Sequence, residues 1–196
     1  MRIALALKGL AHESIAVNLR SGAQRSAEFL ALNPSGLVPT LVDGAARLSQ
    51  SLAIIDHLDC IQPEPLLVPA DGPARGQVLE IAQLIACDIH PLNNLRVLKY
   101  LVHELGLSEA QKNAWYAHWI AEGFNALEAR LPDHDGWCVG TAPTLADCCL
   151  VPQVANAERM NIALTPWPRI KRIAAFARQH PAFIQAEPQR QSDYTA

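Results

Sequence analysis

The sequence predicts a small α/β domain followed by an all-helical domain. In the first third of the chain, short β-branched runs alternate with short helical runs around a strong hairpin signal, Asp43-Gly44. A proline-rich stretch then indicates a linker. Beyond it, apolar residues recur every three or four positions, which is typical of amphipathic helices. We therefore expect an α/β domain over residues 1–62, a linker over 63–73 and a helical domain over 74–196.

The composition is that of a globular protein without a membrane span or a nucleic-acid partner. The chain has 196 residues, a net charge of −3 and 50% hydrophobic residues, enough for a substantial core. No stretch reaches the roughly 18 apolar residues of a membrane-spanning helix. The apolar run within 1–9 is shorter than that of a signal peptide and indicates a helix. The charge balance, with no run of lysine or arginine, argues against nucleic acid.

The cysteines indicate buried thiols in a reducing compartment. There are five of them, at positions 60, 87, 138, 148 and 149. They form no CxxC pair and show no metal-like spacing with histidine, and an odd number argues against a disulfide framework. We expect a cytoplasmic protein without a metal site.

In the α/β part, turn signals and β-branched runs predict short elements. Asn33-Pro34 stops a short helix, because the residue before proline avoids the α region. Asp43-Gly44 joins two strands in a hairpin. The expected elements are a strand over Ser14–Leu19, a helix over Ala27–Leu32, strands over Val38–Val42 and Ala46–Leu48, and a helix over Ser51–Cys60.

In the helical part, capping signals and prolines place the helix ends. An apolar stripe runs from Val78 to Ile89, and Pro91 is expected to kink this helix before a second stripe over 95–105. Two capping boxes, Ser108 with Gln111 and Thr144 with Asp147, open further helices, the second containing Pro152. Pro168 begins the last one, over 170–179.

Three features point to chemistry, and the first is Val38-Pro39 at the start of a strand. A proline there is either a device of a strand edge or a cis peptide that turns neighbouring backbone groups toward a ligand. The residues alone leave both interpretations open.

The second feature is the junction Gln50-Ser51, where a strand runs directly into a helix. A helix N-terminus presents unpaired N–H groups and a partial positive charge, so it can bind a carboxylate. The alternative is that Ser49 or Ser51 only caps the helix.

The third feature is the polar run from Cys87 to Arg96 around the expected kink. Asp88 and His90 could form a metal or acid–base pair, but a hydrogen-bonded structural kink is the more common explanation of such a run. Asp-x-His alone does not decide between them.

Several segments together resemble the zeta class of glutathione transferases, over essentially the whole chain and in order. The resembling segments are Arg2–Gly9, Phe29–Pro39, Gln50–Ile55, Ala86–Asn94, Trp119–Phe124, Pro143–Asp147 and Leu150–Val154. Bacterial maleylacetoacetate and maleylpyruvate isomerases share this set. The resemblance implies a thioredoxin-like α/β domain that binds glutathione, an all-α domain that supplies the second substrate's pocket, and a homodimer.

The resemblance also implies roles for individual residues. Val38 and Pro39 would form a cis-proline turn whose backbone pairs with the cysteinyl part of glutathione. Gln50 and Ser51 would hold its γ-glutamyl end, which favours the anion-site interpretation. The remaining assignments are His90, reaching the ligand across the dimer interface, Asn94 beside it, Gln24 at the glycyl end, and Arg96 at a substrate carboxylate or simply in solvent.

The implied reaction is a glutathione-dependent cis–trans isomerisation in aromatic catabolism. The thiol adds to the cis double bond of a maleyl keto acid, the bond rotates, and elimination leaves the fumaryl isomer. An alternative within the enzymes is a general glutathione transferase or dehalogenase. A different class is a non-catalytic truncated binding protein.

One departure from the class concerns catalysis. Its members begin upstream of this Met1, with a first strand and a turn that carries the serine or cysteine activating the thiol. We therefore expect no catalytic hydroxyl within residues 1–196 and an incomplete thioredoxin-like sheet. We also expect unpaired edges at Ser14–Leu19 and at the strand beginning near Thr40, because the absent strand would lie between them.

Overall fold

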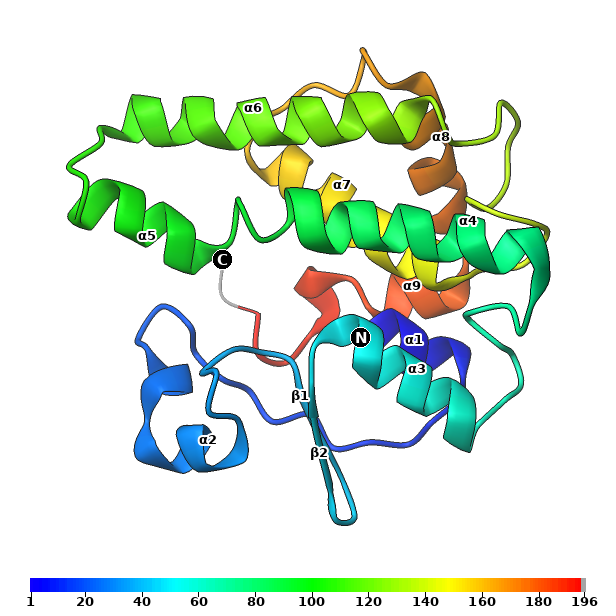
Figure 1. Cartoon of the computed structure of the whole chain (residues 1–196), viewed down its shortest axis with the longest axis horizontal. Coiled ribbons are helices and arrows are strands. Elements are labelled where there is room, and N and C mark those ends of the chain that lie inside the picture. The colour runs from blue at the N-terminus through cyan, green and yellow to red at the C-terminus, as the bar shows by residue number, and fades with distance from the viewer. Residues whose placement is uncertain (195–196) are drawn as a thin grey trace. The chain divides into compact units, whose positions relative to one another are not determined.

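The computed structural model describes residues 1–194, which form two compact units (Figure 1). The first unit contains Met1–Leu67 together with the chain from Pro181 onward, and the second contains Val68–His180. The sequence-based boundaries at residues 62 and 74 stay a prediction. The units differ from them in assigning the segment after His180 to the first unit.

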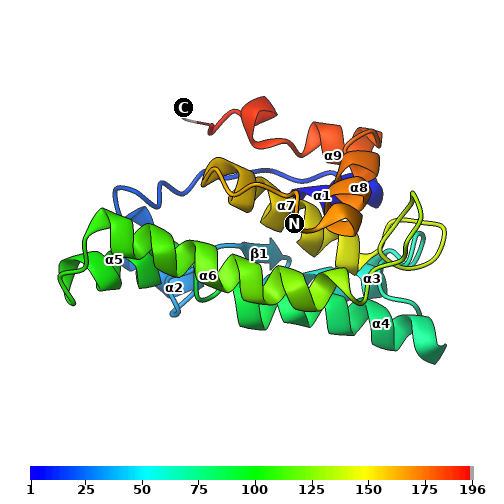
Figure 2. The same cartoon turned by 90° about the horizontal axis from the view of Figure 1, so that it is seen from above.

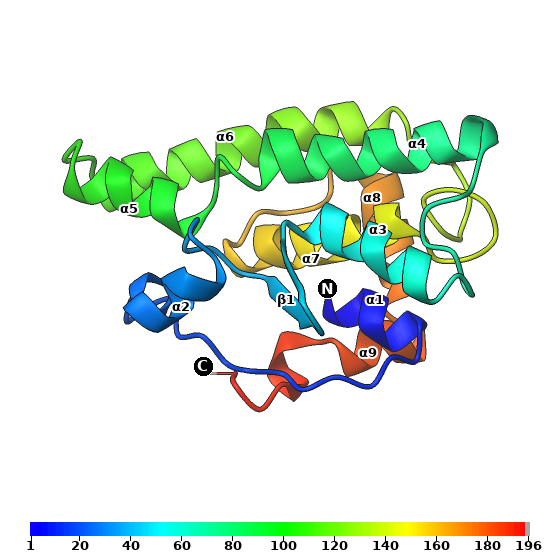
Figure 3. The same cartoon turned by 60° about the horizontal axis from the view of Figure 1, so that its bottom comes forward.

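The first unit combines short helices with one hairpin. Its elements are α1 (Arg2–Leu7), η1 (Ala23–Arg25), α2 (Ala27–Leu32), β1 (Thr40–Asp43), β2 (Ala46–Ser49), α3 (Ser51–Ile61), α9 (Pro181–Gln185) and η3 (Pro188–Arg190). Helix α1 packs against α9, from the opposite end of the sequence (Figure 3). The Arg2 guanidinium also donates to both carboxylate oxygens of Asp193, at 3.0 and 2.9 Å.

Local turn chemistry produced several of the expected elements. Strands β1 and β2 pair in antiparallel fashion from Thr40 opposite Ser49 to Asp43 opposite Ala46, so the Asp43-Gly44 hairpin is confirmed. Gly44 has φ of 54°, the left-handed conformation that glycine adopts without a steric cost. Helix α2 has the predicted bounds, and the Ser26 hydroxyl caps it by accepting from the N–H of Phe29.

The expected strand over Ser14–Leu19 is wrong, because this segment belongs to no sheet in the structure. Within residues 1–194 the sheet consists of β1 and β2 alone. A strand is held by hydrogen bonds to a neighbouring backbone, and no other strand lies beside this segment. Its β-branched residues are instead surface residues, with Ile15 78% exposed. High β-propensity shows only that a segment fits a sheet, and this segment has no neighbouring strand with which to pair.

The second unit is all helical. Its elements are α4 (Gly72–Gln83), the π-helix η2 (Leu84–Ile89), α5 (Leu95–His103), α6 (Glu109–Glu128), α7 (Leu145–Arg159) and α8 (Pro168–Ala177). Helix α7 packs against both α4 and α8, while α6 packs against α8 and runs alongside the π-helical continuation of α4 (Figures 1 and 2). Fully buried side chains of α6, α7 and α8 contribute to the core: Ile120, Phe124, Leu127, Leu150, Ile170 and Ile173.

The expected kink at Pro91 is a complete break. Helix α4 widens into η2, in which the N–H of His90 donates to the carbonyl of Ile85 at 2.8 Å, five residues back. A turn follows, and α5 begins at Leu95. Proline explains the end of the helix, since it cannot donate an N–H. It does not explain the widening, which depends on what packs against it.

Both predicted capping boxes take part in hydrogen bonds. Ser108 and Gln111 cap α6 reciprocally, as predicted. Ahead of α7, the carboxylate of Asp147 accepts from the backbone N–H and the hydroxyl of Thr144, at 2.8 and 2.9 Å. Pro152 lies inside α7, and Pro168 opens α8 at its first position, both as expected.

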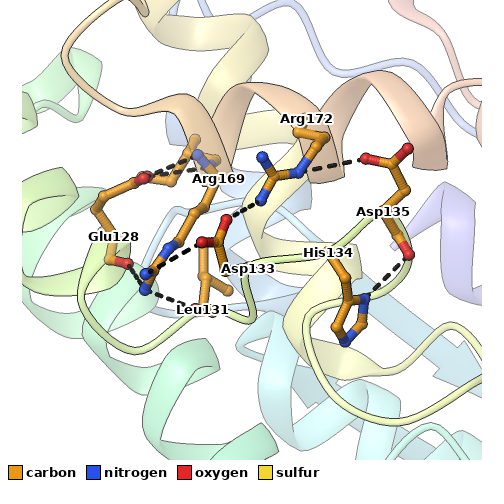
Figure 4. Close-up of polar contacts among 8 residues, drawn as sticks. Glu128, Leu131, Asp133, His134, Asp135, Arg169 and Arg172 are labelled. Carbon is orange, nitrogen blue, oxygen red and sulfur yellow. Dashed lines mark hydrogen bonds and ion pairs between the residues drawn. The ribbon is translucent and has the colours of Figure 1, made fainter.

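A polar network joins the end of α6 to the beginning of α8 (Figure 4). The Glu128 carboxylate accepts from the N–H groups of Arg169 and Ile170, at 2.8 and 3.0 Å, and so caps α8. In return, the Arg169 guanidinium donates to the carbonyl of Glu128, the last residue of α6, and to that of Leu131 just beyond it. Each helix therefore satisfies end groups that the other leaves unpaired.

Candidate functional site

The open end of the β1–β2 hairpin brings four of the predicted site residues together. The peptide bond between Val38 and Pro39 is cis, as the resemblance implied. Thr40, the next residue, pairs with Ser49, and Ser49 directly precedes Gln50. Val38-Pro39 and Gln50-Ser51 therefore lie on the two adjoining chain segments at the end of the hairpin away from Gly44.

Asn33 fixes the loop that leads to this end. Its side chain is 4% exposed and donates to the carbonyl of Leu37 at 2.7 Å and to the hydroxyl of Thr40 at 3.1 Å. The side-chain oxygen Oδ1 of Asn33 accepts from the backbone N–H and the hydroxyl of Ser35. The loop before the cis peptide is thus held from inside, while Val38 itself is 42% exposed.

The beginning of α3 is open to an anion. Gln50 is the N-cap residue, yet no side chain within the described part of the chain caps this helix end. The serine-capping interpretation of the sequence is therefore not what the structure has. The first turn contains no acidic residue, so its N–H groups and partial positive charge are uncompensated. A carboxylate is the ligand that such an end binds.

Gln50 is held in a strained backbone conformation at this junction. Its φ of 73° and ψ of 116° are rare for a residue with a Cβ, and the side chain is exposed. Such strain costs about 1–3 kcal/mol and is typical of functional sites. This strain is not visible in the sequence, since glycine is the residue expected at a positive φ.

Gln24 lies beside the same loop. A Cβ on Gly36 would lie 3.1 Å from the carbonyl oxygen of Gln24, so η1 packs closely on the turn that precedes Val38. The side-chain Oε1 of Gln24 is buried and accepts no hydrogen bond from residues 1–194. A buried acceptor without a donor costs about 1–3 kcal/mol, which a ligand that donates a hydrogen bond there would recover.

The second unit holds the other predicted residues in one short segment after the π-helix. His90 directly follows η2 and is exposed, but the packing around its ring desolvates the imidazolium, so its pKa lies below the ordinary 6.5. Asn94 caps α5, because its side-chain oxygen accepts from the N–H of Arg96 at 3.2 Å. Arg96 is exposed and forms no ion pair with another residue of 1–194. The predicted residues thus form two groups, one in each unit.

Two residues that the sequence did not single out hold this segment. The Asn93 side chain is 8% exposed and donates to the carbonyl of Tyr116 at 3.2 Å. The indole N–H of Trp115 donates to the carbonyl of Leu92 at 2.9 Å. Both bonds connect the turn to α6. The pair of asparagines after Pro91 was the only sign of this role in the sequence. The hydrogen-bond partner of Asn93 is 23 residues away, so it could not be identified from the local pattern.

Two thiols of the second unit, those of Cys138 and Cys149, are unsuited to nucleophilic attack. Burial raises the pKa of Cys138 well above its ordinary value, and the nearby Asp147 carboxylate raises it further. Burial likewise raises the pKa of Cys149 to about 12. Since the thiolate is the nucleophile, these cysteines stay protonated and inert near neutral pH.

Other kinds of site find no support in the described residues. Among residues 1–194, no group of three histidine, cysteine, aspartate or glutamate side chains lies close enough to hold a metal ion. No helix in this part of the chain has both the length and the apolar character needed to cross a bilayer. Two surface hollows of the second unit, around Glu80 with Arg130 and around Trp167 with Arg169, contain none of the predicted site residues.

Both parts of the chain match glutathione S-transferases. The family model for the N-terminal domain of glutathione S-transferases matches residues 1–60, and the one for the C-terminal domain matches residues 109–178. A probable maleylacetoacetate isomerase of Vibrio cholerae is 50% identical over 196 residues. The match covers 98% of this chain and 91% of the relative.

Solved structures extend the similarity to the whole fold. The holo structure of a maleylpyruvate isomerase, described as a bacterial zeta-class glutathione S-transferase, superposes with a TM-score of 0.95 at 46% identity, covering 99% of this chain and 93% of the other. A maleylacetoacetate isomerase from Anaeromyxobacter dehalogenans, with dicarboxyethyl glutathione and citrate in its active site, gives 0.85 at 36% identity, covering 99% and 87%. The first unit is accordingly a thioredoxin-like domain and the second an all-α domain, and the chain belongs to the zeta class of the glutathione S-transferase family.

Proposed function

We propose that this chain catalyses the glutathione-dependent cis–trans isomerisation of a maleyl keto acid, maleylacetoacetate or maleylpyruvate, to its fumaryl isomer. The observation that carries the proposal is the open hairpin end. There the Val38-Pro39 turn adjoins an α3 N-terminus that no side chain within 1–194 caps. A tripeptide with a free carboxylate at each end suits this combination of exposed backbone and a positive helix end. The chain-wide similarity to isomerases of this type adds independent support.

Within this site each residue has a binding task. The N–H groups at the beginning of α3, with Gln50 and Ser51, hold the γ-glutamyl carboxylate. The exposed backbone of Val38 pairs with the cysteinyl unit in extended fashion. The unpaired Oε1 of Gln24 accepts a hydrogen bond from the glycyl end.

The second group of residues serves the ligand and the second substrate. By similarity, His90 and Asn94 reach the ligand, His90 from the partner subunit of a homodimer. His90 is neutral at neutral pH because its pKa is lowered, so it can accept or donate a hydrogen bond without bringing a second positive charge. Arg96, which has no carboxylate partner among the described residues, binds a carboxylate of the keto acid.

Glutathione, when bound, supplies the thiolate whose reversible addition turns the cis double bond into a single bond that can rotate. The protein must favour the thiolate over the thiol, because the thiolate is the nucleophile. It must also hold the substrate while the bond rotates, and Arg96 binds one of the substrate's carboxylates for this purpose. None of the buried thiols described above is needed for the reaction.

The setting of the protein follows from the same account. We place it in the cytoplasm as a homodimer that acts in aromatic catabolism. All five cysteines are free in the structure, which suits a reducing compartment.

The test is an assay of maleylpyruvate isomerisation with and without glutathione. The rate should depend on glutathione, and it should exceed the rate of conjugation of an aryl or alkyl halide. Ser51→Ala should raise the KM for glutathione about tenfold, the cost of one hydrogen bond to a charged group. Ser14→Ala is the matched control, because Ser14 is exposed and far from the hairpin end in sequence. Turnover of halides but not of maleylpyruvate would instead favour the general transferase.

A further inference from the structure

The π-helix that leads to His90 packs closely against α6. Ile89, the last residue of η2, is 0% exposed. A Cβ added to Gly123 of α6 would lie 2.2 Å from Cγ1 and 2.3 Å from Cδ1 of Ile89. Carbon atoms in contact stay about 3.5–4.0 Å apart, so no side chain larger than hydrogen fits at position 123 without moving Ile89.

Two hydrogen bonds attach the residues on the other side of His90 to the same helix. The carbonyl of Leu92 accepts from the indole of Trp115, and Asn93 donates to the carbonyl of Tyr116. Tyr116 and Gly123 are two helical turns, about 10 Å, apart along α6. The chain is therefore held immediately before His90 by apolar packing and shortly after it by hydrogen bonds.

The widening of the helix bears directly on where His90 lies. A π-turn accommodates an extra residue and re-aims the side chain that follows it, and such turns are frequent at functional sites. Since Ile89 and His90 share a peptide unit, any displacement of Ile89 moves the His90 backbone as well. Close-packed interiors transmit such shifts because they contain few voids to absorb them.

We propose that Gly123 is a positioning residue for His90, acting through the contact between α6 and Ile89. The inference rests on the proposed role of His90 at the ligand. Gly123 touches neither glutathione nor substrate. It allows α6 to approach the π-turn, and the approach sets where the imidazole lies.

The test combines Gly123→Ala with a matched control and a compensating variant. Gly123→Ala should lower kcat/KM for maleylpyruvate, at saturating glutathione, about tenfold or more, since a displacement near 1 Å can cost far more than that. Gly76→Ala is the control, because Gly76 also lies inside a helix and has no atom within 4 Å of its would-be Cβ. Adding Ile89→Ala removes both clashing atoms, so the double variant should recover much of the loss.

A double-mutant cycle of Gly123→Ala with His90→Gln separates an effect on the position of His90 from a general loss of structure. If Gly123 acts through His90, Gly123→Ala should cause less than about a twofold further loss in the His90→Gln background. Equal losses in both backgrounds, or an effect no larger than that of Gly76→Ala, would overturn the inference. If Gly123→Ala does not fold, Trp115→Phe carries the same cycle, because it removes one attachment without adding volume. Should His90→Gln alone leave turnover unchanged, the proposed role of His90 fails first, and that single variant shows it.

Discussion

The ammonium group of Lys8 lies 2.7 Å from Oδ1 of Asp59, and neither side chain has more than 7% of its surface exposed. The same ammonium donates to the carbonyls of Gln62 and Pro65 at 2.6 and 2.9 Å, so its three donors are all used. Asp59 also accepts from the N–H of Leu67 at 3.0 Å. One buried pair thus connects the segment after α1 to the end of α3 and the chain that follows it.

Lys8→Met should destabilise the first unit by about 3–5 kcal/mol, because it leaves the Asp59 carboxylate buried without its counter-charge. Methionine keeps the apolar stem, so the loss measures the charge rather than the packing. Urea unfolding of the full chain, followed by hydrogen exchange of α1 and α3, measures it. A change below about 1 kcal/mol would mean that water reaches Asp59 in solution. The double variant with Asp59→Asn should recover part of the loss.

Asp147→Asn should cost the second unit about 2–4 kcal/mol. The carboxylate accepts from the N–H groups of Cys138 and Thr144, both at 2.8 Å, and is fully buried. An amide of the same shape must turn its NH2 group toward one of these donors, which leaves a buried N–H unpaired. Glu122→Gln makes the same chemical change at an exposed site of α6 and should stay within about 0.5 kcal/mol. Equal effects of the two variants on the urea midpoint would contradict this role of Asp147.

Two substitutions of Gln50 should separate its strain from its side chain. Gln50→Gly removes the side chain and relieves the positive φ, so it should raise the unfolding free energy by about 1 kcal/mol. Gln50→Ala removes the side chain and keeps the strain, so it should not stabilise the protein. Both should weaken glutathione binding. Stabilisation by both variants, or by neither, would show that the strained conformation is not what sets the stability at this junction.

The imidazole of His90 should titrate below pH 6.5, because desolvation lowers its pKa. As the pH falls through 6.5, the unfolded chain takes up this proton before the folded chain does. The contribution of His90 to stability is therefore complete above that pH and is lost as the pH falls toward its folded pKa. His90→Gln should flatten the decline of the unfolding free energy between pH 7 and 5. NMR titration of the imidazole, assigned with this variant, measures the pKa directly. A midpoint at or above 6.5 would show that the imidazole is not desolvated.

The parts of the fold that the sequence predicted depend on local chemistry. Asp43-Gly44 and the pair Ser108 with Gln111 each act within a few residues, and each formed as expected. Ser14–Leu19 failed because a strand depends on a neighbour that its own residues cannot supply. The π-turn before His90 was missed for a related reason, since Ile89 meets Gly123 only after the chain has folded.

The site divides in the same way. Val38-Pro39 and the Gln50-Ser51 junction were found because proline and a strand-to-helix transition are visible in sequence. The positive φ of Gln50 was not found, because glutamine has no preference for that conformation. Asn94 was assigned to the ligand by resemblance, while the structure adds a capping role for the same side chain. Its contact with a ligand stays a proposal.

Calorimetric titration of the chain with glutathione and with the dipeptide Cys-Gly tests the central claim most directly. If the open end of the β1–β2 hairpin and the beginning of α3 form the binding site, glutathione should bind saturably near one molecule per chain. Cys-Gly, which lacks the γ-glutamyl carboxylate, should then bind at least about tenfold more weakly, the loss expected for a charged group at a helix N-terminus. Equal binding of the two peptides, or no binding of glutathione to the folded chain, would contradict the account.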